Sequence, residues 1–353
     1  MDTAKVWLKR GIELDGRPAQ IRMAKVGGAV VAGVTSATTP EVSYDRITHD
    51  MDAMDPELRG FAWEGVGTAL TTGDIRLQTA SKESAERGLT LRANAVAEAN
   101  PTWRKWIIMG IGLGFGRTLA HAMADADTGP RWSEVSGAYL SELVRGTVTC
   151  FLKHILSCDA VDAMLICDGL GMALASGDPD NWLVPTASFS RLAEETSSTG
   201  ARAVMRSAER GFDQGVGRAA WFVNCGEPEK IISTLSTFGA SKRLPDLWGG
   251  VGFAGTYAGG VPEAQWRDLV ARASAARGYL AQAAACVANS RLKSSGAFQE
   301  TEIGCRATWD RSARDALIEL QNWFENPSDA SIAAAPNGWR HVRFLTEFPD
   351  QAR

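Results

Sequence analysis

The sequence has no excess of charge of either sign and no long apolar run. Lys and Arg number 37 and Asp and Glu number 41 among 353 residues, which gives a net charge of -4. No strong positive field is therefore available to hold a nucleic acid or an anionic membrane. The longest apolar run, 106–113, is interrupted by glycine and far too short to span a bilayer. We expect no nucleic-acid partner and no stable membrane insertion.

Cysteine and histidine are scarce and irregularly placed. The six cysteines form no CxxC pair, and the four histidines show no metal-ligand spacing, which argues against a disulfide scaffold and a catalytic zinc site. The opening segment lacks the apolar core of a signal peptide. A Gly-x-Ser-x-Gly motif, a Walker phosphate loop and a strand-linked dinucleotide fingerprint are also missing. We expect a cytoplasmic protein that binds no nucleotide or flavin cofactor.

Glycine, by contrast, is plentiful and repeated. The chain has 36 glycines, roughly ten per cent against a usual ~7%, and they cluster within apolar stretches. One phrase, Gly-x-Gly followed by small and apolar residues, occurs five times. Its copies begin at Gly65, Gly114, Gly169, Gly215 and Gly250, which are 35 to 55 residues apart. This spacing predicts about one helical hairpin per copy.

The pattern of the intervening segments predicts the fold class. Segments such as 188–210 and 263–277 are amphipathic with a helical period, whereas the glycine phrases are apolar nearly all round and predict buried helices. Outer amphipathic helices that alternate with inner small-residue helices are typical of an α/α barrel. A sixth inner candidate is 278–288, and no alternating run of six residues indicates a strand. The sequence predicts an all-α toroid of about six hairpins around a central apolar cavity.

The predicted toroid sets the domain boundaries. A chain of this length exceeds one modest core, yet a repeat-built barrel can reach it as a single domain. We expect an N-terminal segment with a first outer helix over 1–50, the barrel over 51–325 and a C-terminal tail over 326–353.

Acidic residues stand just before four of the five phrases. Glu64 and Asp168 directly precede the first glycine, Asp213 stands two residues before it, and Asp246 stands four before. The inner helices of an α/α barrel begin at the same end, so we expect these four carboxylates to converge there as the catalytic set. The alternative is that each is an N-cap or first-turn acid that stabilises its helix by ~1 kcal/mol. Asp168 and Asp213 rank first, because neither has a neighbouring proline that explains it as a plain helix start.

Aromatic and cationic residues accompany these acids. Trp and Phe number 12 each against four Tyr, a composition that favours an apolar cavity over a sugar site. Arg117 and Arg218 hold the same place in two phrases and need an acid or an anionic substrate group as partner. The predicted substrate-binding residues are Arg117, Arg218, Trp63, Phe212, Trp221, Trp248, Phe253 and Tyr257.

Carboxylates among aromatic walls indicate carbocation chemistry. An acid can protonate an alkene, or carboxylates can bind Mg²⁺ and a diphosphate, while Trp and Phe faces stabilise positive charge. We expect a terpene-cyclase-like enzyme, a lyase or isomerase, that acts on a hydrophobic isoprenoid or polyene, with Mg²⁺ as the one cofactor such chemistry could use. A non-catalytic polyene carrier needs only an apolar cavity, and a glycan-active enzyme could use the same acids. Both stay open as alternatives.

The run Asp50-Met51-Asp52-Ala53-Met54-Asp55 resembles a metal-binding aspartate cluster. However, Asp55-Pro56 is also a strong helix start, with Asp as N-cap and Pro at the first position. We favour the helix-start interpretation, and we assign no residues as metal ligands.

Three stretches carry a resemblance to a known family. Residues 59–65 (RGFAWEG), 212–223 (FDQGVGRAAWFV) and 246–260 (DLWGGVGFAGTYAGG) look like the signature stretches of the bacterial family called domain of unknown function 1702. The resemblance covers roughly residues 55–260. Members of that family are found beside natural-product biosynthetic genes, including polyketide and enediyne clusters. The resemblance therefore implies an enzyme of specialised metabolism.

Overall fold

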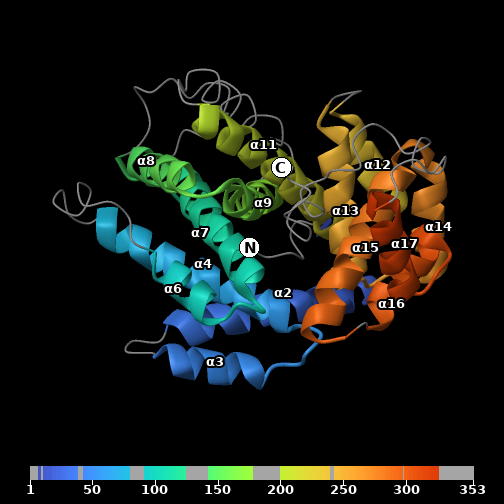
Figure 1. Cartoon of the computed structure of the whole chain (residues 1–353), viewed down its shortest axis with the longest axis horizontal. Coiled ribbons are helices and arrows are strands. Elements are labelled where there is room, and N and C mark those ends of the chain that lie inside the picture. Colours follow the sequence, from blue (N-terminus) through green and yellow to red (C-terminus); the bar gives the residue numbers. More distant parts are fainter. Residues whose placement is uncertain are drawn as a thin grey trace. The chain divides into compact units, whose positions relative to one another are not determined.

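The protein is all-α in the part of the chain that the structure describes. This computed structural model describes residues 7–8, 11–38, 43–79, 91–124, 142–177, 199–238, 242–296 and 298–325. Within them the regular elements are helices, with no strand (Figure 1). They are α2 (Pro18–Thr38), α3 (Tyr44–Asp52), α4 (Arg59–Thr79), α6 (Arg92–Ala99), α7 (Arg104–Ala124), α8 (Glu142–Ser157), α9 (Ala160–Gly177), α11 (Thr199–Val223), α12 (Pro228–Ser236), α13 (Leu244–Ala258), α14 (Glu263–Arg272), α15 (Arg277–Ser294), α16 (Gln299–Trp309) and α17 (Ala313–Glu325). The predicted fold class is confirmed.

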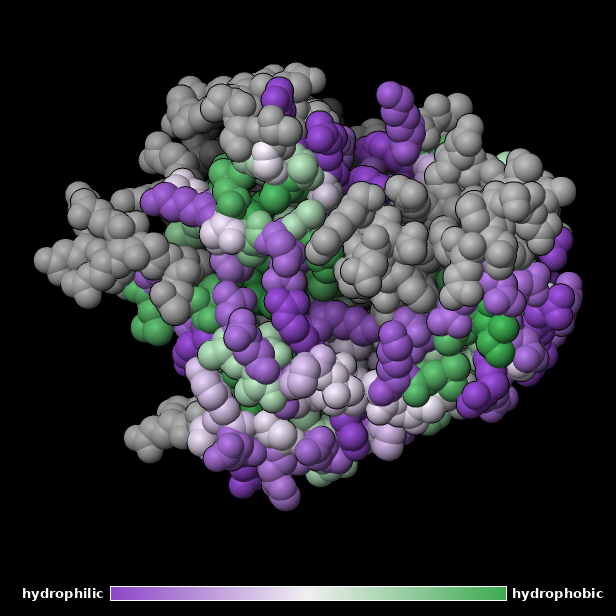
Figure 2. All heavy atoms as spheres, viewed as in Figure 1, coloured by the Kyte–Doolittle hydropathy of each residue, from purple (hydrophilic) through white to green (hydrophobic). Residues whose placement is uncertain are grey.

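The described helices are too short or too polar for a bilayer. A search of these residues finds no helix that combines the length and the apolar character needed to cross a membrane. On the face shown in Figure 2, hydrophilic side chains cover much of the coloured surface and hydrophobic ones form separate patches.

Contacts divide the chain into two compact units. Unit 2 comprises Val26–Gly215, and unit 1 comprises Met1–Lys25 together with Val216–Arg353. The boundaries fall inside α2 and α11. The toroid and the predicted division at residues 50 and 325 stay predictions, and the tail 326–353 lies outside the described residues.

In unit 2 the glycine phrases bring neighbouring helices into backbone contact. A Cβ atom on Gly65 would overlap the carbonyl oxygen of Val30 in α2, and one on Gly67 would overlap that of Ile107 in α7. Residues i and i+2 of a helix point about 200° apart. The first glycine of the phrase therefore contacts the preceding helix and the second contacts the following one. The phrase encodes a helix packed closely between two others.

The same rule holds along the chain. In α9, Gly169 meets Met109 of α7, while Gly171 meets Phe212 of α11. In unit 1, Gly217 of α11 meets Leu247 of α13. Gly252 of α13 meets α15 at Leu280 and Ala283, so the sixth inner candidate does lie beside α13. The prediction that Gly67, Gly171 and Gly252 are buried is confirmed.

Successive glycine helices run parallel. Gly110 of α7 lies against Gly67 of α4, and Gly114 lies against Thr71 one turn further along both helices. Parallel neighbours need a return segment between them, and the outer helices α6, α8, α12 and α14 occupy those positions in the chain. In contrast, α2 runs antiparallel to α4, since Gly33 meets Ala62 and Gly65 meets Val30.

The residue between the two glycines faces the outer layer. In unit 2, Phe115 of α7 is fully buried and packs edge to face on Phe151 of α8, with ring centroids 5.3 Å apart. In unit 1, Val251 is also fully buried, and Gly255 faces the ring of Trp266 in α14. We call the opposite side of each glycine helix its inner face. The residue before the first glycine and the residue after the second both point there.

Two predicted boundaries are wrong. The segment 188–210 is not a separate outer helix, because α11 runs unbroken from Thr199 through the glycine phrase to Val223, and 188–198 lie outside the described residues. Gly211 does not end this helix, since its missing side chain makes room for the carbonyl of Met164. Likewise, 263–277 contains α14 and a separate 3-10 turn at Ser274–Ala276.

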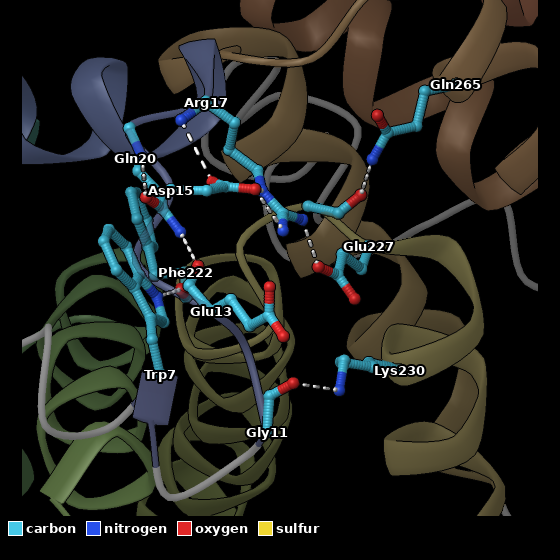
Figure 3. A network of polar contacts seen from close by, with 12 residues as sticks. Trp7, Gly11, Glu13, Asp15, Arg17, Gln20, Phe222, Glu227, Lys230 and Gln265 are labelled. Atoms are coloured by element: carbon cyan, nitrogen blue, oxygen red, sulfur yellow. Dashed lines mark hydrogen bonds and ion pairs between the residues drawn. The ribbon is translucent and has the colours of Figure 1, made fainter.

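The N-terminal segment of unit 1 is held by polar contacts (Figure 3). The indole of Trp7 donates to the carbonyl of Phe222 at 2.8 Å. Arg17 pairs with Glu227 at 2.6 Å, just before α12. Together these contacts fix residues 11–17 near the end of α11.

Candidate functional site

The predicted catalytic acids do not begin their helices. Glu64 is the sixth residue of α4, Asp168 the ninth of α9 and Asp213 the fifteenth of α11. This contradicts both convergence at the helix N-termini and the N-cap alternative for these three. The physical reason is that the glycine phrases mark helix crossing points, which lie well inside long helices. Asp246 alone of the four lies in a first turn, that of α13.

Glu64 and Asp168 share the inner face of unit 2. Each stands immediately before the first glycine of its phrase, and they are 1% and 0% exposed. Gln214 holds the same position in α11, is fully buried, and donates through Nε2 to an Asp168 carboxylate oxygen at 2.5 Å. Burying a carboxylate without partners is costly. The hydrogen bond from Gln214 offsets part of that cost.

Asp213 points elsewhere. It stands one residue before Gln214, so its Cβ is turned about 100° from the direction shared by Glu64 and Asp168. Asp213 is buried, but helix geometry places it on the side of the outer layer. The sequence interpretation ranked it beside Asp168 and missed Gln214, although the position in the phrase carried the signal.

Apolar residues separate the two inner-face acids. The glycines 110, 112, 114 and 116 form two successive Gly-x-Gly phrases in α7, and both follow the contact rule: Gly110 and Gly114 meet α4, while Gly112 and Gly116 meet α9. The inner-face positions of α7 are therefore Met109, Leu113 and Arg117. Met109 and Leu113 are buried. Because α7 lies between α4 and α9, Glu64 and Asp168 flank an apolar strip.

Arg117 continues this strip toward the C-terminal end of α7. Burial by surrounding protein lowers the pKa of the Arg117 guanidinium, and the nearby Glu64 carboxylate raises it. Its side chain nevertheless stays exposed to solvent. As predicted, an arginine of one phrase therefore lies near one of the acids, Arg117 near Glu64.

The aromatic residues predicted to bind substrate are all buried but do not share one face. Trp63 and Phe212 precede their glycine phrases by two and three residues, which turns both toward the outer layer. The same argument applies to Trp248 of α13. In unit 1, Phe253 of α13 and Arg218 of α11 occupy inner-face positions, and Tyr257 stands one turn beyond Phe253.

Two of the unit 1 aromatics make specific packing contacts. The ring of Trp221 stacks on Trp266 with centroids 5.1 Å apart, and its Nε1 donates to the carbonyl of Gly259 at 3.3 Å. Tyr257 stacks on Phe253 at 5.7 Å and lies 3.5 Å from the guanidinium of Arg291. Both side chains thus take part in the core of unit 1.

Asp246 has an aromatic neighbour on α15. Burial raises the pKa of the Tyr279 hydroxyl, and the Asp246 carboxylate raises it further. Asp246 is 4% exposed, and it belongs to unit 1, whereas the other three acids belong to unit 2.

The aspartate run 50–55 has structural partners. Asp50 accepts from Ser36 at 2.9 Å and pairs with Arg46 at 2.8 Å, and these contacts lower its pKa. Asp55 accepts from the backbone N–H of Glu57 at 2.9 Å. It caps a turn that precedes α4, which begins only at Arg59. Among the described residues no group of three His, Cys, Asp or Glu side chains is arranged to hold a metal ion.

A cysteine and a histidine meet at the turn between α8 and α9. The Cys158 sulfur lies 3.9 Å from Nε2 of His154. Burial, followed by the carboxylates of Asp162 and Asp159, raises the pKa of the Cys158 thiol to about 12. A thiol that stays protonated is a poor nucleophile.

Comparison with known proteins gives one match. The model of a family described as protein of unknown function (DUF1702) matches residues 2–343. No curated protein and no solved structure matches the chain.

Proposed function

The chain belongs to the DUF1702 family of proteins of unknown function, and on this premise we propose that it is a terpene-cyclase-like enzyme of specialised metabolism. Its substrate is a hydrophobic isoprenoid or polyene, its site of action is the cytoplasm, and its reaction is a cyclisation through a carbocation. The observation that carries the proposal is the pair of buried carboxylates, Glu64 and Asp168, on either side of the strip of Met109 and Leu113.

Asp168 is the residue proposed to transfer the proton. Its carboxyl hydrogen passes to one carbon of an alkene, the π electrons form the new C–H bond, and positive charge appears on the neighbouring carbon. Attack by the next alkene closes a ring and moves the charge. Loss of a proton from a carbon beside the final cation, to the Asp168 carboxylate directly or by way of Glu64 and water, restores the protonated Asp168 and makes the net reaction an isomerisation.

The surroundings of Asp168 suit this role. Gln214 holds the carboxylate by one of its oxygens, which fixes its orientation toward the inner face. The Met and Leu side chains of the strip are apolar and carry no hydroxyl, amine or carboxylate, and methionine adapts to irregular apolar shapes. Glu64, on the far side of the strip, is placed to stabilise the positive charge or to accept the final proton.

The experiment compares two Asp→Asn variants of the same helix. Asp168→Asn keeps the shape and removes the acidity, whereas Asp162→Asn alters an acid that pairs with Arg104 at 2.6 Å at the beginning of α9. Each protein is incubated with geranyl, farnesyl and geranylgeranyl diphosphates and with squalene, and extracts are analysed by mass spectrometry. A general acid contributes ~10²–10⁴-fold, so Asp168→Asn should lose at least about 100-fold in turnover while Asp162→Asn keeps it.

The outcomes separate an enzyme from a carrier. Reaction in D₂O should add one deuterium to the product if protonation by an exchangeable acid starts the cyclisation. Binding of these substrates without conversion by the parent protein would favour the polyene carrier. Equal turnover by Asp168→Asn and the parent would remove Asp168 from the mechanism.

A further inference from the structure

Arg117 has an unusual position for a cation on a glycine helix. It lies on the inner face of α7, one turn beyond Leu113 and two beyond Met109, and its side chain is exposed. No described residue forms a hydrogen bond or ion pair with its guanidinium, and Glu64 acts on it only electrostatically. The five N–H donors of this guanidinium therefore face solvent and stay available to a ligand.

The equivalent arginine in α11 behaves differently. Arg218 also follows the second glycine of its phrase, but it is 1% exposed and engaged in interactions within the protein. An arginine that follows the second glycine of a phrase is therefore not always exposed to solvent. Arg117 differs from Arg218 in presenting its donors to solvent at the end of an apolar strip.

The geometry of α7 connects this cation to the proposed reaction. Met109, Leu113 and Arg117 are four residues apart, so they form one line along the helix. The eight residue steps from Met109 to Arg117 rise about 12 Å along the helix, a length comparable to an extended chain of two or three isoprene units. A chain that starts at Arg117 and follows the strip passes between Glu64 and Asp168.

We propose that Arg117 binds the anionic head group of the substrate, a diphosphate or a carboxylate, and that the hydrocarbon chain lies along Leu113 and Met109. This assignment rests on the proposed function and specifies its substrate class: an isoprenoid with a charged head. Guanidinium groups bind such oxyanions through paired, charge-assisted hydrogen bonds. The head is then held at the open end of the strip, and the alkenes reach the buried acids.

The test measures binding, independently of turnover, with three ligands of one chain length. Farnesyl diphosphate, farnesoic acid and farnesol are titrated by calorimetry in buffer with EDTA, so that no metal bridges a head group to the protein. The parent protein should bind at least one of the charged ligands about tenfold or more tightly than farnesol. The two charged ligands distinguish a diphosphate site from a carboxylate site.

Variants assign the preference to Arg117. Arg117→Gln should remove the advantage of the charged ligand and leave the affinity for farnesol within about twofold, which also reports that the strip is intact. Arg117→Lys keeps the charge and should retain part of the advantage. Arg46→Gln, which alters an exposed arginine of α3 paired with Asp50, is the matched control and should bind like the parent.

Several results would overturn the assignment. The parent could bind farnesol as tightly as both charged ligands, or Arg117→Gln could weaken all three ligands equally or none of them. A loss of charge preference in Arg117→Gln, combined with normal turnover by Asp168→Asn, would keep the anion site and reject the acid. The reverse combination would keep the acid and reject the anion site.

Discussion

At the scale of single residues, position within the Gly-x-Gly phrase determines the environment of each candidate side chain. The residue before the first glycine points to the inner face, as Glu64, Asp168 and Gln214 do, and the residue between the glycines points to the outer layer. A shift of one residue turns a side chain by about 100°. Asp213 and Gln214 are neighbours in sequence, and it is Gln214 that donates a hydrogen bond to Asp168.

The Asp168–Gln214 pair makes a prediction about stability. Gln214→Leu removes the donor but leaves the buried carboxylate, so the free energy of unfolding should fall by about 1–3 kcal/mol. Replacing both partners, in D168L/Q214L, should restore part of that loss because no polar group is then left buried. Urea unfolding of the two single variants and the double variant measures the coupling. Additive effects would show that the hydrogen bond contributes nothing.

Cys158 provides a prediction about pH. Its thiol has a pKa raised to about 12, and the thiolate is the reactive form. Raising the pH from 7 to 9 should therefore leave the folded protein unlabelled by iodoacetamide at this position, whereas the urea-unfolded chain should react readily. Peptide mass spectrometry locates the label, with Cys158→Ser as the control. Labelling of Cys158 in the folded protein at pH 8 would contradict the raised pKa of its thiol.

At the scale of elements, glycine lets parallel helices pack backbone against backbone. Parallel neighbours align their dipoles unfavourably, and the close packing that glycine permits at these contacts offsets this cost. The predicted amphipathic outer helices and small-residue inner helices follow directly from this arrangement. A second Gly-x-Gly phrase of α7, Gly110 to Gly112, is also present in the sequence.

Two glycine substitutions test this packing. Gly112→Ala would place a methyl group against the carbonyl of Ile166 in α9, and we expect it to destabilise the protein by about 3 kcal/mol. Gly28→Ala in α2 is the matched control, because no atom lies within 4 Å of its new Cβ. That substitution should stabilise the protein by about 0.5–1 kcal/mol through higher helix propensity. Thermal and urea unfolding report both values. Similar stabilities of the two variants would show that α7 and α9 do not pack this closely.

At the scale of the whole molecule, the chain forms two units that are not consecutive in sequence. Unit 1 combines the first 25 residues with the part of the chain after residue 215. Trp7 is part of this association, since its side chain is 4% exposed and bonds to Phe222. Hydrophobic periodicity describes one element at a time, so it gave no sign that the N-terminus belongs with the C-terminal part.

Trp7→Ala tests this division. Loss of the indole removes a buried aromatic group and its hydrogen bond, which we expect to lower amide protection at the end of α11 and in α12 of unit 1. Protection of α4 and α7 in unit 2 should change little. Hydrogen exchange read by mass spectrometry distinguishes the two. An equal loss of protection in both units would mean that they unfold together.

The sequence by itself determined the helical class, the glycine repeat and the burial of the glycine phrases, because both the 3.6-residue period and the need for glycine at close contacts are local properties. It also identified Glu64, Asp168 and Arg117 from their places beside the phrases. Only the tertiary structure decided where along each helix the phrases lie and which helix each glycine contacts. These contacts show that Asp168 and Asp213 point to different sides of their helices. They also place Gln214, Met109 and Leu113 near Asp168. Trp221 and Tyr257 take part in core packing. The physical reason is that a buried side chain takes its role from neighbours that are distant in sequence, and those neighbours are fixed only when the helices pack.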